Sequence, residues 1–132
     1  MSNILIIGAG SMGTAFSFPC IDNNHKVSIV GTYLEDKFID QINLTKKHPL
    51  LKCDVPKDVK FLKFEKLSEE INNKKVDLIV VAVSSKGIDW ASEELSKVLK
   101  EKIPILILTK GLAINNNKYE VLAHKMERLL KK

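Results

Sequence analysis

Short apolar runs and segments of helical spacing alternate along the whole chain. Residues 4–7 carry no polar side chain, which is typical of a strand buried on both faces of a parallel sheet. Similar runs predict further strands at residues 26–31, 59–62, 77–83 and 105–108. Apolar residues three or four positions apart predict helices at residues 12–22, 35–42, 64–72, 87–99 and 119–130.

Two segments depart from this alternation. Pro19 falls inside the first predicted helix and is expected to kink or shorten it, because proline removes a helical N–H. Residues 43–58 form a long polar connection that contains Pro49 and Pro56, and we expect little regular structure there.

The order of the predicted elements indicates the fold class. Strands that alternate with helices should pair in parallel through right-handed crossovers, with the sheet covered on both sides. We therefore expect an α/β fold, a Rossmann-type doubly wound and mostly parallel sheet with helices on both faces. Residues 1–132 are expected to form this one domain.

A glycine-rich turn follows the first predicted strand and reads Gly8-Ala-Gly10-Ser-Met-Gly13. Between a buried strand and a helix, this spacing is typical of a dinucleotide-binding turn. Gly8 permits the tight turn, Gly10 lets the backbone approach a pyrophosphate, and Gly13 lets the helix pack close to the sheet. The N–H groups and the positive dipole end of that helix would bind the phosphates. The alternative is a glycine turn without a ligand, but strand, spacing and helix all favour a site for NAD or NADP.

Composition and charge exclude some classes of function. The chain is 45% hydrophobic and 28% charged, and no apolar run reaches the roughly 20 residues of a membrane span. The net charge of +5 comes from lysines interleaved with acids, so we expect no nucleic-acid partner, and mild basicity suits phosphate ligands. Cys20 and Cys53 lack metal or redox spacing, so we expect no metal site and a reduced, cytoplasmic setting.

Several motifs in a fixed order carry a resemblance to a known family. They are the glycine segment from Gly8 to Ala15, residues 27–31, His48-Pro-Leu-Leu with Val55-Pro56, Ala82-Val-Ser-Ser85 and Leu108-Thr-Lys-Gly111. Together they are similar to the cofactor domain of NAD(P)-dependent glycerol-3-phosphate dehydrogenases. The glycine loop alone would also fit ketopantoate reductases or 6-phosphogluconate-type dehydrogenases, and the later motifs narrow the choice. The resemblance implies reduction of dihydroxyacetone phosphate to sn-glycerol 3-phosphate, which supplies a phospholipid head-group precursor.

The resemblance also implies roles for particular residues. Ser11 and Met12 match the loop pair that contacts the cofactor, although Met12 replaces an aromatic residue that is common there. Thr32 and Tyr33 occupy the place where the family meets the adenosine ribose. The other cofactor-binding positions that the resemblance implies are Val83 and Ser84, the latter in place of a common proline, and Lys110.

Lys110 is also a candidate on physical grounds. It follows a predicted parallel strand, at the edge of the sheet where such folds bind ligands. A lysine there offers three donors and a positive charge to a phosphorylated substrate, next to the cofactor. The alternative is one more solvated lysine, and the position at the strand end favours the functional role.

The family's second half is a helical domain with the main catalytic lysine and most substrate contacts, and this chain has no counterpart to it. Hydride transfer needs a fixed substrate and an acid, and only Lys110 offers one here. We therefore expect a cofactor-binding half that is inactive or nearly so alone and that contacts the absent domain or forms a homodimer. The alternatives are a stand-alone NAD(P)-binding sensor or partner subunit, and the cofactor domain of another reductase.

The sequence gives only a weak indication of whether the chain prefers NAD or NADP. An acid at the end of the second strand favours NAD, and a nearby arginine favours NADP. Thr32 holds that place, with Glu35, Asp36 and Lys37 slightly later. A neutral hydroxyl predicts discrimination within about tenfold.

Overall fold

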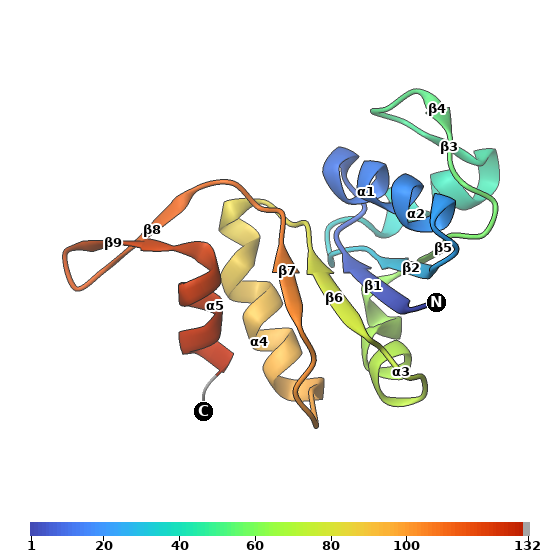
Figure 1. Ribbon diagram of the computed structural model, residues 1–132. Helices are drawn as coiled ribbons and strands as arrows, with labels where there is room; N and C mark the ends of the chain where they lie inside the picture. Colours follow the sequence, from blue (N-terminus) through green and yellow to red (C-terminus); the bar gives the residue numbers. More distant parts are fainter. Residues whose placement is uncertain (131–132) are drawn as a thin grey trace.

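The computed structural model describes residues 1–130 and confirms the predicted α/β architecture (Figure 1). Five strands form one parallel sheet in the order β5-β2-β1-β6-β7. These strands are β1 (Asn3–Ile7), β2 (Lys26–Val30), β5 (Lys60–Leu62), β6 (Leu78–Val81) and β7 (Ile105–Ile107). Because β1 lies between β2 and β6, the chain winds first to one side of β1 and then to the other, as in doubly wound folds.

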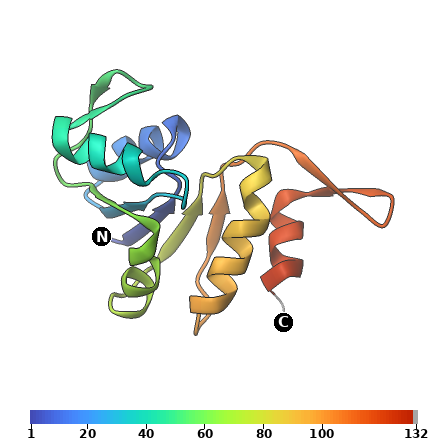
Figure 2. The ribbon, with the colours of Figure 1, turned by 180° about the vertical axis from the view of Figure 1, so that it is seen from behind.

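Helices cover both faces of this sheet. The helices are α1 (Ser11–Asp22), α2 (Asp36–Thr45), α3 (Leu67–Asn72), α4 (Ile88–Val98) and α5 (Leu122–Leu130), with short 3-10 turns η1 (Phe64–Lys66) and η2 (Ser85–Gly87). Successive residues of β1 point to opposite faces, so Ile4 and Ile6 pack with α1 and α2, whereas Leu5 and Ile7 pack with α3, α4 and α5. In Figure 2, seen from behind, α4 and α5 stand side by side on the near face.

Pro19 does not shorten the first helix as expected. Helix α1 includes it and continues to Asp22. Cys20, on the same helix, is buried and free, and this burial raises the pKa of its thiol.

Residues 43–58 are more regular than predicted. Helix α2 continues to Thr45 and ends where Lys46 takes a left-handed conformation, with φ of 60°. A small antiparallel pair follows, β3 (Lys47–His48) with β4 (Cys53–Asp54). The polar composition of this segment gave no indication of the strand pair. The side chain of His48, on β3, is fully buried and holds the pair against the domain.

The predicted helix at residues 119–130 is wrong in its first turn. Residues 118–121 instead form β9 (Lys118–Val121), which pairs with β8 (Leu112–Asn115) in an antiparallel hairpin that extends away from the sheet (Figure 1). Asn116 and Asn117 both have positive φ, 52° and 63°, the conformation of a two-residue hairpin turn. Helix α5 therefore begins only at Leu122.

Candidate functional site

The glycine turn joins β1 to α1 at the carboxyl edge of the sheet. Gly8 has φ of +112°, and a Cβ at this position would lie 2.5 Å from the carbonyl oxygen of Ala82. Gly13 packs directly against the backbone of Gly8, so a side chain there would separate the helix from the sheet. A Cβ at Gly10, by contrast, would have no atom of the described chain within 4 Å. The turn is thus closed toward the protein at Gly8 and Gly13 and open to solvent at Gly10.

The open side of the turn presents the amino end of α1. Gly10 caps this helix in an extended conformation, without a side-chain cap, and the first turn of α1 contains no acidic residue. The N–H groups of the first turn, from Ser11 onward, have no intrahelical acceptor by the geometry of any α-helix. Free donors and a positive dipole end make this position suitable for a phosphate group.

The peptide units around Ala9, between the first two glycines, are held from both sides. The N–H of Ala9 donates to Glu35 Oε1 at 3.1 Å, and Glu35 Oε1 also accepts from the N–H of Thr32 at 2.8 Å. The carbonyl oxygen of Ala9 lies 2.9 Å from His48 Nε2, while His48 Nδ1 accepts from the N–H groups of Leu50 and Leu51. Since Nδ1 accepts both of these hydrogen bonds, Nε2 is the ring nitrogen that can donate to the carbonyl oxygen of Ala9. The glycine turn is therefore positioned by side chains from two later segments.

A cleft of about 290 Å³ lies beside the glycine turn. It brings together four of the residues predicted from the sequence, and its lining is Met12, Ala82, Val83, Ser84, Ser85, Leu108, Thr109 and Lys110. The hydroxyl of Thr109 donates to the carbonyl oxygen of Val83 at 2.6 Å, which ties the segment after β7 to the segment after β6. Lys110 is exposed and makes no ion pair with the described residues, so its charge is available at the mouth of the cleft.

Ser84 stands where the resemblance leads one to expect proline. Its φ of −64° and ψ of 162° are values that proline itself adopts. The serine therefore leaves the course of the backbone compatible with the family's turn.

Thr32 and Tyr33 lie at the end of β2 and do not line this cleft. The Thr32 hydroxyl accepts from the N–H of Leu34 at 3.3 Å. The Tyr33 ring is half exposed and tilted against Trp90, with 5.4 Å between the ring centroids. The structure thus divides the predicted residues into a group at Lys110 and Ser84 and a group at the end of β2, with the glycine turn between them.

Sequence reasoning missed Glu35, His48 and Trp90 as parts of this region. The sequence marks Glu35 only as an acid near Thr32, and His48 only as part of a motif. A buried histidine within a polar segment carries no local pattern that predicts its contact with residue 9, which is 39 positions away.

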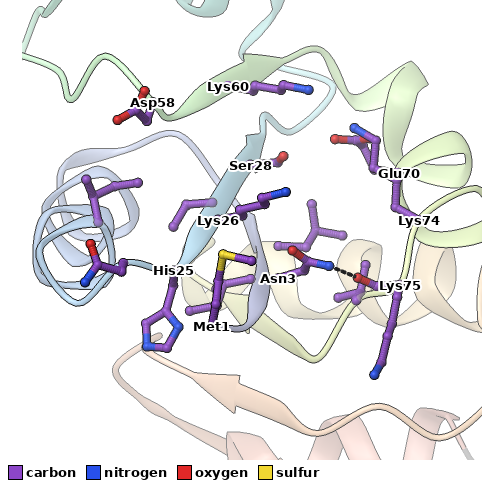
Figure 3. A pocket seen from close by; sticks show the side chains of 16 residues that line it. Met1, Asn3, His25, Lys26, Ser28, Asp58, Lys60, Glu70, Lys74 and Lys75 are labelled. Atoms are coloured by element: carbon purple, nitrogen blue, oxygen red, sulfur yellow. Dashed lines mark hydrogen bonds and ion pairs between the residues drawn. The ribbon is translucent and has the colours of Figure 1, made fainter.

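A larger pocket of about 790 Å³ lies at the opposite edge of the sheet (Figure 3). It is lined by residues at the amino ends of β1, β2 and β5, among them Lys26 and Lys60. Glu70 points into it: Oε2 accepts from Lys74 Nζ at 2.6 Å, and Oε1 is buried with no hydrogen-bond partner among residues 1–130. This hydrogen bond raises the pKa of Lys74. Ligands of doubly wound sheets bind at the carboxyl edge, so this pocket is not the candidate site.

A parallel sheet in the order β5-β2-β1-β6-β7, with a glycine turn leading into α1, defines a Rossmann-type dinucleotide-binding domain. Comparison with known proteins identifies the family within this class to which the chain belongs. Residues 3–132 match the family described as "NAD-dependent glycerol-3-phosphate dehydrogenase N-terminus", and the chain belongs to that family. The resemblance drawn from the sequence motifs is thereby confirmed.

Individual relatives agree. The chain is 30% identical over 129 residues to a glycerol-3-phosphate dehydrogenase [NAD(P)+] of Exiguobacterium sp., covering 96% of this chain and 37% of the relative. It is 35% identical over 109 residues to the protein of the same name from Lactococcus lactis subsp. cremoris, covering 83% of this chain and 31% of that relative. The crystal structure of glycerol-3-phosphate dehydrogenase from Coxiella burnetii has the same fold, with a TM-score of 0.82, 22% identity, and coverage of 99% of this chain and 38% of that one.

The chain spans about a third of the length of these curated relatives. Within residues 1–130, no helix has the length and apolar character needed to cross a membrane.

Proposed function

We propose that this chain is the cofactor-binding part of a glycerol-3-phosphate dehydrogenase and binds NAD(H) or NADP(H) along the carboxyl edge of its sheet. The observation that carries the proposal is the open glycine turn, in which Gly10 leaves free space before the amino end of α1. The pyrophosphate would bind there, with the adenosine toward Thr32 and Tyr33 and the nicotinamide toward Val83 and Ser84.

The reaction assigned to the whole protein is hydride exchange between dihydroxyacetone phosphate and sn-glycerol 3-phosphate. The family and the names of the relatives support this assignment. Lys110, exposed at the mouth of the 290 Å³ cleft, would meet the anionic substrate beside the nicotinamide. The remaining substrate contacts and the principal proton donor would come from a further domain or a second copy of the chain. The free cysteines, Cys20 and Cys53, are consistent with a reduced, cytoplasmic setting.

Titration of NADH into the 132-residue chain, followed by calorimetry, tests the cofactor assignment. We expect a Kd in the micromolar range or weaker, because in this proposal a further domain or a second copy completes the site, and a loss of at least about tenfold in Gly10→Val. The β-branched side chain would fill the space that the pyrophosphate needs, while the apo fold has room for it. Ala123→Val, at an exposed position of α5, is the matched control and should leave binding unchanged. Unchanged NADH affinity in a folded Gly10→Val would overturn the assignment.

A further inference from the structure

Glu70, on α3, is a buried acid in the 790 Å³ pocket at the amino ends of the strands, and it is only 5% exposed. Oε2 accepts from Lys74 Nζ at 2.6 Å, whereas Oε1 has no hydrogen-bond partner among residues 1–130. A buried acceptor without a donor costs free energy, and most buried polar groups have partners. A ligand that donates a hydrogen bond to Oε1 would offset this cost.

Lysines supply the other chemistry of this pocket. Four lysines and two carboxylates line it, and Figure 3 shows Lys26 and Lys60 extending toward the side on which Glu70 lies. In the described part of the chain, neither Lys26 nor Lys60 makes an ion pair. An ammonium group is a donor only, so these two lysines favour an anionic ligand.

One acceptor among several cations is selective for an anion that also carries a hydrogen. A carboxylate oxygen accepts from an O–H group and repels an oxygen that has none. Inorganic phosphate near neutral pH keeps at least one hydroxyl beside its charged oxygens, whereas sulfate has only acceptors. A phosphate monoester loses its second proton at about pH 6 and is therefore mostly without a hydroxyl at pH 7.

We propose that this pocket is a second ligand site, for inorganic phosphate that retains a proton. Glu70 Oε1 would accept from the phosphate hydroxyl, and the ammonium groups of Lys26 and Lys60 would bind the charged oxygens. Oε1 is closed to solvent in the free chain, so the exposed side chains of Lys60 and Lys74 would turn aside to admit the ligand. The site lies at the opposite edge of the sheet from the glycine turn and does not depend on the proposed function.

Titration of the 132-residue chain with phosphate, sulfate and methyl phosphate, followed by amide NMR at about 0.1 M salt, tests this proposal. We expect phosphate to bind with a Kd of about 1 mM or tighter and to shift the amides of residues 26, 60 and 70. Sulfate and methyl phosphate should bind at least about fivefold more weakly, because neither offers the required hydroxyl.

Glu70→Gln replaces the charged acceptor with an amide that can also donate. The ratio of phosphate to sulfate affinity should therefore fall to about twofold or less, mainly through tighter sulfate binding. Glu69→Gln is the matched control, since it makes the same charge change on the adjacent residue, which pairs with Lys66 at the surface. It should leave the ratio at its wild-type value.

The possible results separate this site from the glycine turn. Amide shifts confined to residues 8–13 would place phosphate at the proposed dinucleotide site and overturn the inference. Equal affinity for phosphate and sulfate in the wild type, or an unchanged ratio in Glu70→Gln, would also overturn it. Should Glu70→Gln not fold, Lys60→Gln at an exposed position decides: it should weaken phosphate binding about fivefold or more, and undiminished affinity would refute the site.

Discussion

Gly8 and Gly10 are two residues apart in one turn, yet their surroundings are opposite. Gly8 has a left-handed backbone and would press a side chain into the carbonyl group of Ala82, whereas a side chain at Gly10 would meet only solvent in the apo chain. The first glycine is therefore required by the fold, whereas under the proposed function the second is required by the dinucleotide.

We expect Gly8→Ala to lower the free energy of unfolding by about 3 kcal/mol or more, since it adds a backbone clash to an unfavourable φ. Gly10→Ala should change stability by less than about 1 kcal/mol, because glycine and alanine both tolerate its conformation. Urea unfolding of the two variants measures the difference. Equal destabilisation by both would show that the two glycines do not have separate roles.

The parts of the site that could be predicted are those encoded within a few residues. The glycine spacing sets the turn, and Lys110 lies next to its own strand, so local sequence located both. Glu35 and His48 act on Ala9 across 26 and 39 positions. No pattern of polar and apolar residues specifies such pairs, because they depend on how the later loops fold back over the turn.

At the scale of elements, the hairpin β8–β9 was not predicted for a similar reason, because the local pattern of residues does not specify it. Leu112 and Ile114 on β8 and Tyr119 and Val121 on β9 occupy alternate positions of their strands and are all exposed. The pattern was compatible with the start of a helix, and the asparagine turn that separates the strands was the overlooked signal. The sheet and the five major helices were predicted because their apolar faces are buried, and burial selects one periodicity.

A bidentate ion pair attaches this hairpin to α5. Arg128 Nη2 and Nε on α5 lie 2.9 and 3.2 Å from the two carboxylate oxygens of Glu120 on β9. The hydrogen bonds from Arg128 lower the pKa of the Glu120 carboxyl group. A lowered pKa means that the stabilisation is present above the unfolded-state value and is lost as the pH falls through the folded-state value.

We expect Arg128→Ala to raise the pKa of Glu120 toward the ordinary glutamate value, as followed by carboxyl-carbon NMR during an acid titration. Lys97→Ala, which removes a cation from the surface of α4, should leave the Glu120 titration unchanged. A Glu120 pKa that is insensitive to Arg128 would mean that the pair does not hold the hairpin in solution.

At the scale of the whole molecule, the site is open on the side of Lys110. Among the described residues, the lining of the cleft offers one cation, Lys110, whereas hydride transfer requires a fixed substrate and a proton donor in a site that excludes water. The chain spans about a third of the length of these relatives, and under the proposed function the remaining groups would come from a further domain or a second copy of the chain.

We therefore expect the 132-residue chain alone to show no measurable reduction of dihydroxyacetone phosphate in an NADH absorbance assay. Supplying the C-terminal domain of a relative, fused or in trans, should restore turnover. Lys110→Ala should then lower kcat/KM by about 100-fold, with a much smaller change in cofactor affinity. Lys118→Ala, in the nearby hairpin, is the matched control. Enzyme-like turnover by the isolated chain would refute the need for a second domain.

The hairpin β8–β9 begins at Leu112, two residues after Lys110. A two-stranded ribbon with an exposed apolar face is marginally stable by itself, so its amides should exchange with deuterated solvent through local opening. The amides of β1, buried at the centre of the sheet, should exchange only through global unfolding.

Thr109 is fixed to Val83, and Gly111, with φ of +129°, leads into the ribbon. Lys110 thus stands at the boundary between a part of the chain that we expect to open rarely and a part that we expect to open often. Any surface that covers the ribbon would also reduce the conformational entropy of this lysine, so that docking and ordering of the charge would occur together.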